Sequence, residues 1–241
     1  MLPQPPPNAP APPPSEAAIL SQKKWKWLWV IGVGSIIVIV LAVLTAPMTI
    51  RSRKKSDQTE AVNNARQIGL ALFEFAAKYG KYPDVSTIAD VRKDAATDLN
   101  LSKMSLGMKS SNDYFRQLLA GGITPSESMF YAKIPNTKKP DNNIKGAEAL
   151  KKGECGFAYL AGLSSEGNPS RPLIVTPLIP GTDRLDPKRF DGKAIILRMD
   201  NSVTSININS SGHVIQFGKN LLDPTNPVWG KADKFVIAWP E

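Results

Sequence analysis

The 241-residue chain contains one cysteine, Cys155, and one histidine, His213. A single cysteine forms no intrachain disulfide, so the cysteine content indicates no redox compartment. A mechanism that needs a histidine base would have to use His213. The sequence also lacks a phosphate-binding loop, a dinucleotide fingerprint, a zinc-ligand pattern and an H-E-x-x-H motif. We therefore predict no enzyme activity, no cofactor and no metal. A hydrolase that uses His213 or aspartate is kept as an alternative.

Acidic residues are scarce in the first 56 positions, which contain seven basic residues and one acid, Glu16. The whole chain has a net charge of +9, but 23 basic and 20 acidic residues lie beyond position 56. Most of the excess charge therefore flanks one apolar segment, where it can meet lipid headgroups. The remainder shows no basic stripe with interleaved aromatic residues, so we predict no nucleic-acid partner.

Charge is absent from Trp27–Ile50, a segment of 24 residues. As a helix it would be roughly 36 Å long at about 1.5 Å per residue, which exceeds a hydrocarbon core of about 30 Å. A cleaved signal peptide would have a shorter apolar core. We therefore predict a transmembrane helix over 27–50, with the lipid bilayer as a partner. The flanking residues suit the membrane interface: Trp25, Trp27, Trp29, Arg51 and Arg53.

Residues 1–26 precede this segment and are rich in proline, with eight prolines in the first 14 positions. Such a tail favours an extended polyproline II conformation and builds no core. It is either a docking motif for an aromatic groove or a solvated tail. Basic residues flank the apolar segment on both sides, so charge does not decide the membrane orientation.

The stretch AVNNARQIGLALFEFAAKYGKYPD, Ala61–Asp84, follows the apolar segment closely. Its apolar residues recur at spacings of three or four, which predicts an amphipathic helix. Gly80 suits a left-handed C-cap and Pro83 prevents continuation. We expect a stalk helix over 51–80, continuous with the membrane helix. The face that packs on the domain consists of Val62, Ala65, Ile68, Leu72, Phe75, Ala76 and Tyr79.

The first part of the remaining domain, 81–241, has helical signals. A short polar helix is predicted over 87–97 and a clearer one over 111–122, capped by Asn112 or Asp113. The sequence Thr124-Pro-Ser-Glu127 has the pattern of a capping box. The stretch 133–153 is polar and rich in Asn and Lys, so we expect an exposed loop.

From residue 154 the pattern changes to short apolar or alternating runs bounded by turn residues, which predicts strands. The runs are CGFAYLAG, PLIVTPL, KAIILRM, VTSINI, HVIQF and FVIAW. Short connections join the third, fourth and fifth runs, so we expect these three to form an antiparallel meander. Helices followed by strands predict an α+β fold, in which the helix at 61–79 covers the apolar face of a small antiparallel sheet.

Several aspartates lie in the loop-rich part of this region, and Asp183, Asp186 and Asp191 are the nearest to a calcium-binding pattern. Their spacing fits no EF-hand. The intervening basic residues offset their charge, which favours ordinary turn aspartates.

The apolar helix, the polar stretch after it and the sequence Ala61–Asp84 together resemble type IV pilin-like proteins. The nearest resemblance is to the major pseudopilins of type II secretion and to their relatives in planctomycete- and verrucomicrobia-type bacteria. Helices of that family typically end in a Tyr-Gly-x-Tyr/Phe-Pro-like sequence, matched here by Tyr79, Gly80, Tyr82 and Pro83. The resemblance touches most of 40–241. It implies an N-terminal membrane helix whose second half packs on a small sheet.

The chain departs from that family at its N-terminal side. Pilin precursors carry a Gly-Phe-Thr-Leu-x-Glu-like motif where the apolar helix begins, and none is present here. No acid occurs between Glu16 and Asp57 to pair with a neighbouring subunit. We therefore expect a non-polymerising inner-membrane protein with a periplasmic pilin-like domain, acting in secretion or in the cell envelope with other proteins of that compartment. The alternative is a polymerising pseudopilin subunit, and the sequence does not indicate the oligomeric state.

Overall fold

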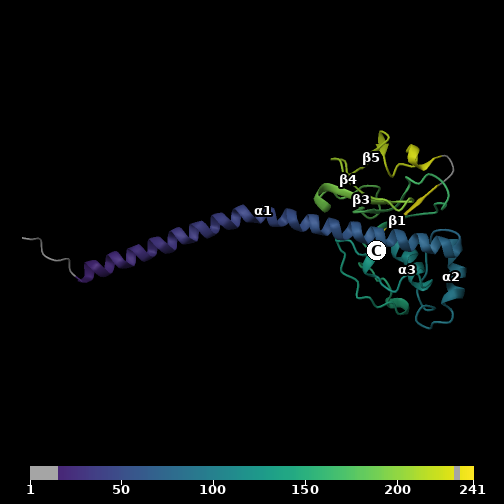
Figure 1. Ribbon diagram of the computed structural model, residues 1–241, viewed down its shortest axis with the longest axis horizontal. Coiled ribbons are helices and arrows are strands. Elements are labelled where there is room, and N and C mark those ends of the chain that lie inside the picture. Colours follow the sequence, from purple (N-terminus) through teal and green to yellow (C-terminus); the bar gives the residue numbers. More distant parts are fainter. Residues whose placement is uncertain (1–15, 231–233) are drawn as a thin grey trace, which may run out of the picture. The chain divides into compact units, whose positions relative to one another are not determined.

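The computed structural model describes residues 16–230 and 234–241 (Figure 1). Within the first helix, the side chains of several residues lie outside the described set: 16–24, 26, 36–38 and 42–51. Residues 1–15, which hold the proline-rich sequence, also lie outside it. The chain forms two compact units, 1–51 and 52–241. The second unit contains every element after the first helix.

Helix α1 spans Glu16–Tyr79 and so includes the segment expected at 27–50 and all but the last residue of the helix expected over 51–80. It ends where the sequence indicates. Gly80 adopts a left-handed φ of 79°, and its N–H donates to the carbonyl oxygen of Ala76 over 2.8 Å. Only glycine adopts this conformation without a steric penalty, so its position sets the end of the helix.

The side chains of Trp25, Trp27 and Trp29 are exposed, as is that of Arg53, whereas that of Arg51 lies outside the described set. None of the helical stretches formed by the described residues combines the length and the hydropathy that a membrane crossing requires. The segment predicted to cross the membrane includes residues 36–38 and 42–50, whose side chains are not among those described.

The second unit has an α+β fold, as the order of helical and strand signals predicts. Among the described residues, α1 is followed by the α-helices α2 (Ile88–Ala95) and α3 (Ser111–Ala120). The short 3-10 turns in the same described part are η1 (Val85–Thr87), η2 (Ser128–Phe130), η3 (Gly146–Glu148), η4 (Phe190–Gly192) and η5 (Pro227–Trp229). The strands are β1 (Ala158–Ala161), β2 (Pro172–Thr176), β3 (Lys193–Arg198), β4 (Val203–Asn207), β5 (Ile215–Gln216), β6 (Lys219–Asn220) and β7 (Val236–Ala238).

The main sheet has five strands in the order β4-β3-β2-β1-β7, and every neighbouring pair is antiparallel. Strands β1 and β2 are buried along their whole length, and β3 is buried beyond its first residue. Burial on both sides explains why these strands are continuous apolar runs in the sequence rather than alternating ones. The edge strand β4 is only half-buried.

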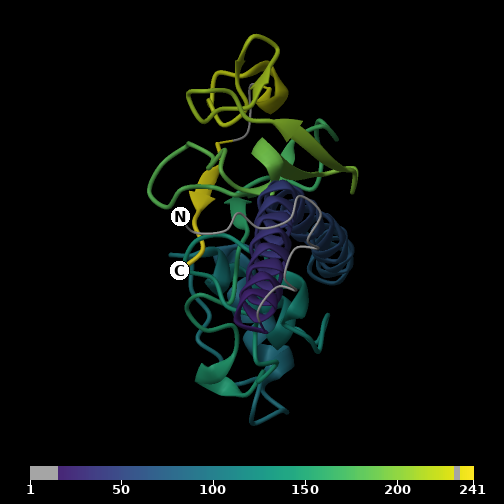
Figure 2. The ribbon, with the colours of Figure 1, turned by 90° about the vertical axis from the view of Figure 1, so that its left-hand side faces the viewer.

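The C-terminal part of α1, residues 52–79, lies between the sheet on one side and the layer of α2 and α3 on the other (Figures 1 and 2). Gly69 makes the approach to the sheet close. A Cβ atom at this position would lie 2.0 Å from Oδ1 of Asn201 and 2.8 Å from Cδ1 of Leu197. On the other side, Nδ2 of Asn64 donates to the carbonyl oxygen of Tyr131 over 2.8 Å. The helix is thus the central element of this unit.

The expectation of a three-stranded meander is wrong in its third strand. β3 and β4 form the expected hairpin, but the next run, HVIQF, leaves the sheet and pairs as β5 with β6. The turn at 209–213 is closed by Asn209, whose Oδ1 accepts from the N–H groups of Ser211 and His213. In the same turn, the carbonyl oxygen of Gly212 accepts a hydrogen bond from the N–H of Leu185 over 2.7 Å. The turn is therefore bonded to the loop before β3, and the chain does not return along β4.

Two expected helix caps are also wrong. Helix α3 is capped by Ser110, whose Oγ accepts from the N–H of Asp113, and not by Asn112 or Asp113 themselves. The Asn112 amide instead donates to the carbonyl oxygens of Leu150 and Lys151. The capping box expected at Thr124 does not form either: Thr124 Oγ1 accepts from the N–H of Ser126, and the N–H of Glu127 donates to Asn142 instead.

The polar stretch 133–153 is not simply an exposed loop. Ile134, Ala149 and Leu150 are buried and belong to the hydrophobic core. The stretch crosses the α3 layer and leads into β1. Its many polar residues made it resemble a solvated loop, since hydrophobic periodicity is absent there.

Candidate functional site

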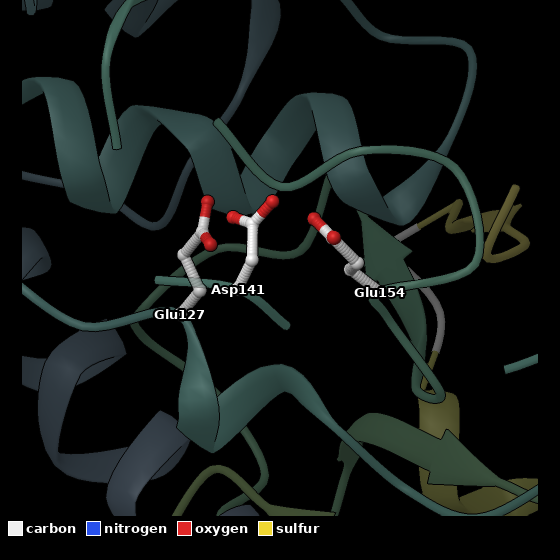
Figure 3. Close-up of side chains that lie close together, drawn as sticks. All are labelled: Glu127, Asp141 and Glu154. Carbon is white, nitrogen blue, oxygen red and sulfur yellow. The ribbon is translucent and has the colours of Figure 1, made fainter. Parts of the chain in front are cut away.

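Three carboxylates that are far apart in the sequence meet beside α3: Glu127, Asp141 and Glu154. One carboxylate oxygen of each can be chosen so that all three lie within 4.8 Å of one another. Figure 3 shows the three carboxyl groups pointing into one shared space. Glu127 and Glu154 have no solvent exposure, whereas Asp141 is exposed. We call these three residues the carboxylate cluster.

Glu127 immediately precedes η2 and is fixed at both its backbone and its side chain. Its N–H donates to Oδ1 of Asn142 over 2.8 Å. Its Oε1 accepts a very short hydrogen bond from the N–H of Leu150. Its other oxygen, Oε2, is buried and has no hydrogen-bond partner. The side chain is therefore fixed through Oε1, while Oε2 accepts no hydrogen bond.

Glu154 and Asp141 are held by backbone and lysine groups. Oε2 of Glu154 accepts from the N–H of Lys151 over 2.7 Å, and Nζ of Lys138 lies 3.3 Å from its Oε1. Oδ1 of Asp141 accepts from the N–H of Asn143, and Nζ of Lys151 lies 2.9 Å from its Oδ2. Lys151 also pairs with Glu148 at 2.8 Å.

Arg116 on α3 also holds the turn at 149–150. Its Nε and one terminal nitrogen donate to the carbonyl oxygens of Ala149 and Leu150, over 2.9 and 2.8 Å. Its other terminal nitrogen pairs with Asp113. Leu150 has a φ of 44°, which is rare for a residue with a branched side chain. The planar guanidinium matches two carbonyl groups at once and keeps this conformation in place.

The pKa of Glu127 is raised in the cluster, whereas that of Asp141 is lowered. Burial raises the pKa of Glu127, and the nearby carboxylates of Glu154 and Asp141 raise it further against the lowering effect of the Leu150 N–H. Hydrogen bonds from Lys151 and from the Asn143 N–H lower the pKa of Asp141. The ion pair with Glu148, followed by that with Asp141, raises the pKa of Lys151. A buried carboxyl group next to two others is a place where a proton or a cation is needed.

The residues predicted to form the packing face of the stalk lie on one side of α1. Ile68, Leu72 and Phe75 have no solvent exposure, and Val62 and Tyr79 are partly buried against the same core. Gly80 ends the helix, and Pro83 is buried just beyond it, where its carbonyl accepts from the Tyr159 hydroxyl over 3.0 Å.

One feature of α1 escaped the sequence analysis. Leu70 and Phe73, one turn apart on the face away from the core, are 61% and 65% exposed. The stripe of core residues predicts only the buried face of the helix. Two exposed apolar residues are too few to form a periodic pattern that would predict a second apolar face.

The two residues considered for nucleophilic chemistry have unrelated surroundings. Cys155 is fully buried, with Ser111 Oγ 3.5 Å from its Sγ, and burial raises the pKa of its thiol to about 11. Its thiol also borders a largely apolar pocket of about 620 Å³, lined among others by Pro177 and Ile179. His213 lies beside Asp183, with 3.9 Å between Nε2 and Oδ2. A raised thiol pKa works against a nucleophilic role.

The aspartates considered for calcium have local partners. Asp183 accepts from the Asn220 amide over 2.9 Å, and Asp186 accepts from the N–H of Lys188 over the same distance. Asp191 lies in η4 with a φ of 57°. Within residues 16–230 and 234–241, these three do not form a group of ligands, whereas the carboxylate cluster does.

The sequence analysis missed the carboxylate cluster because each member has an ordinary explanation on its own. Glu127 fits a capping box, and Asp141 lies in a polar stretch. Glu154 gave the one usable signal, an acid directly before the apolar run CGFAYLAG. Compared with protein-family models, curated proteins and solved structures, the chain matches none.

Proposed function

We propose that this chain is a non-enzymatic, single-pass bacterial inner-membrane protein, in which a pilin-like α+β domain serves as a structural or accessory component of secretion or of the cell envelope. Its N-terminal tail would be cytoplasmic and the domain periplasmic. The support from the sequence is the uncharged segment Trp27–Ile50 with tryptophans at one end and basic residues at both.

The observation that carries the proposal is the position of α1 in the domain. The helix that contains the apolar segment ends at Tyr79, and its part from residue 52 is enclosed between the sheet and the α2–α3 layer. The part of the helix from residue 52 is an integral element of the domain, because Ile68, Leu72 and Phe75 are in its core. This suits a membrane-anchored stalk better than a detachable enzyme domain. The resemblance to pilin-like proteins rests on the same helix and on its end at Gly80.

The placement in the membrane can be tested in a bacterial host that produces the full chain with a different epitope tag at each end. We expect the protein to stay in the membrane pellet after carbonate extraction. In spheroplasts, added protease should remove the C-terminal tag and spare the N-terminal one. A C-terminal tag that is protected until detergent is added would contradict the periplasmic orientation, and release by carbonate would contradict the membrane anchor.

A polymerising subunit is the second candidate, and the exposed pair Leu70 and Phe73 favours it. Apolar side chains one turn apart on a free helix face provide a surface for another helix. If the chain polymerises through this face, the double change Leu70→Ser and Phe73→Ser will abolish crosslinked oligomers in membranes while leaving the unfolding temperature almost unchanged. Double substitution of exposed Arg66 and Gln67 to serine is the matched control. A mature protein that still begins Met-Leu-Pro would count against this candidate.

A further inference from the structure

The carboxylate cluster contains a buried oxygen that the described chain does not satisfy. Oε2 of Glu127 is inaccessible to solvent and accepts no hydrogen bond, although Oε1 of the same group does. Buried carboxylate oxygens are normally paired, because removing an ionised group from water without compensation is costly. The carboxyl group that carries this oxygen shares one space with the carboxylates of Asp141 and Glu154.

The neighbouring lysines do not balance this group of charges. Lys138 reaches Glu154, but its own side chain is 60% exposed, so water screens the pair. Lys151 divides its charge between Asp141 and Glu148. Neither lysine supplies a hydrogen bond to Oε2 of Glu127. The cluster therefore keeps an excess of negative charge at Glu127, which like Glu154 has no solvent exposure.

We propose that Glu127, Asp141 and Glu154 bind one divalent cation of the calcium class. The observations that support this are three carboxylate oxygens in one shared space, two of the three residues fully buried, and one buried oxygen without a partner. The proposal concerns the domain alone and does not depend on whether the chain crosses a membrane or polymerises.

The chemistry of the ligands selects the ion. All three are carboxylates, which hard cations prefer, and neither histidine nor cysteine is part of the cluster, as zinc sites commonly require. Two oxygens bound to one Ca²⁺ at about 2.4 Å each can be up to about 4.8 Å apart, so the observed separation fits a single ion. Mg²⁺ demands a smaller and more regular shell. The exposed side of Asp141 leaves room for water to complete the coordination.

A cation here would join three separate parts of the connection between α3 and β1. Glu127 lies next to η2, Asp141 lies in the polar stretch, and Glu154 lies four residues before the first residue of β1. The ion would hold these segments together in addition to Arg116, which already binds the carbonyl oxygens of Ala149 and Leu150. Binding to the folded state alone stabilises that state. The expected consequence is a fold that is more stable in the presence of calcium.

The test uses the full chain purified in detergent, stripped with EDTA and dialysed into chelator-free buffer. Titration with CaCl₂ in a calorimeter should give saturable 1:1 binding with a dissociation constant of about 0.1–1 mM, the range of extracellular calcium modules. Calcium at 5 mM should raise the unfolding temperature by several degrees over EDTA, and MgCl₂ at the same concentration by less. No saturable heat together with equal unfolding temperatures in calcium and EDTA would overturn the proposal.

Variants identify the ligands. Glu127→Gln and Glu154→Gln keep an oxygen that can accept from the N–H groups of Leu150 and Lys151, so the fold should persist while the affinity for calcium falls at least tenfold. Asp141→Asn should lower the affinity for calcium in the same way, and because Asp141 is exposed the substitution should leave the fold intact. Glu148→Gln is the matched control, because Glu148 pairs with Lys151 but is not in the cluster, and its affinity should stay within twofold of the parent. Unchanged affinity in Glu127→Gln would mean that Glu127 needs a proton and not a metal ion.

Discussion

Helix α1 packs against two layers, and these layers are held together by different kinds of interaction. On the sheet side, strands β1, β2 and β3 bury aliphatic residues, and Gly69 lets the helix backbone come close. On the other side, charged groups are buried both on α3, which contains Arg116, and in the connection from Gly121 to Glu154, which contains Glu127. The first layer depends mainly on volume and contact, although Arg198 of β3 is also buried, whereas the second depends more on the balance of charges. They should therefore respond to different perturbations.

Removing core volume from α1 should have the largest effect. Phe75 has no solvent exposure and its ring lies 4.5 Å from that of Tyr79. We expect Phe75→Ala to lower the free energy of unfolding by about 3–5 kcal/mol. Phe73→Ala is the matched control on the exposed face, and we expect a change within about 0.5 kcal/mol. Denaturant titration of the full chain in detergent measures both, and similar losses would refute the assigned orientation of the helix.

Removing the buried guanidinium group of Arg116 on α3 should have the second-largest effect. Arg116→Ala removes the side-chain donor to the carbonyl oxygen of Ala149 and one of the two side-chain donors to that of Leu150, and it removes the ion-pair partner of Asp113. We expect a loss of about 3 kcal/mol, as for other broken buried pairs. Arg116→Lys should recover only part of it, because an ammonium group does not match two carbonyls as a guanidinium does. Arg66→Ala, at an exposed position, is the control, and the same denaturant titration applies. Full recovery by lysine would show that only the charge matters there.

The cap of α3 should contribute less. Ser110 accepts from the N–H of Asp113 and is nearly buried. We expect Ser110→Ala to cost about 1 kcal/mol. The exposed Ser105→Ala should cost almost nothing, which thermal unfolding can resolve by comparison. If the Ser110 variant is as stable as the Ser105 variant, Ser110 is not the stabilising cap, and Asn112 or Asp113 would again be the candidates.

The smallest effect has a distinctive dependence on pH. The pKa of Glu127 in the folded state is above its unfolded value of about 4.5, because of burial and of the facing carboxylates Asp141 and Glu154. The folded state is thus favoured by protonation of Glu127. This contribution is fully present below the unfolded pKa and is lost as the pH rises through the folded one. Lys138 and Lys151 form ion pairs with Glu154 and Asp141, and these pairs reduce the repulsion that the two carboxylates exert on Glu127.

Replacing Glu127 with Gln removes this titration. With EDTA present, we expect the unfolding temperature of Glu127→Gln to exceed that of the parent by an amount that grows as the pH rises above about 4.5. Thermal unfolding at a series of pH values measures it. Glu74→Gln, at an exposed position, controls for the loss of net charge. A difference that shrinks with rising pH would reverse the assigned sign.

Much of the fold follows from local patterns. The stripe from Val62 to Tyr79 and the stop at Gly80 predict the end and the buried face of α1, because helical periodicity and the left-handed cap are properties of neighbouring residues. The runs PLIVT and KAIILR predict β2 and β3 for the same reason. The departure of β5 from the sheet is not local, since it depends on a hydrogen bond between Leu185 and Gly212.

The candidate site shows the limit of local patterns more clearly. Glu127, Asp141 and Glu154 are separated by 14 and 13 positions in the sequence, and no spacing rule joins them. Arg116 similarly looks like a surface residue of an amphipathic helix until the turn at Leu150 is placed against it.

The sequence by itself therefore determined the elements whose signals lie within a few residues: the uncharged segment, the amphipathic helix, its stop and most of the strands. The tertiary structure decided which charged residues are buried and which carboxylates meet. The physical reason is that secondary structure reflects short-range periodicity and backbone conformation. Burial of charge depends instead on partners brought together by the folded connection between α3 and β1.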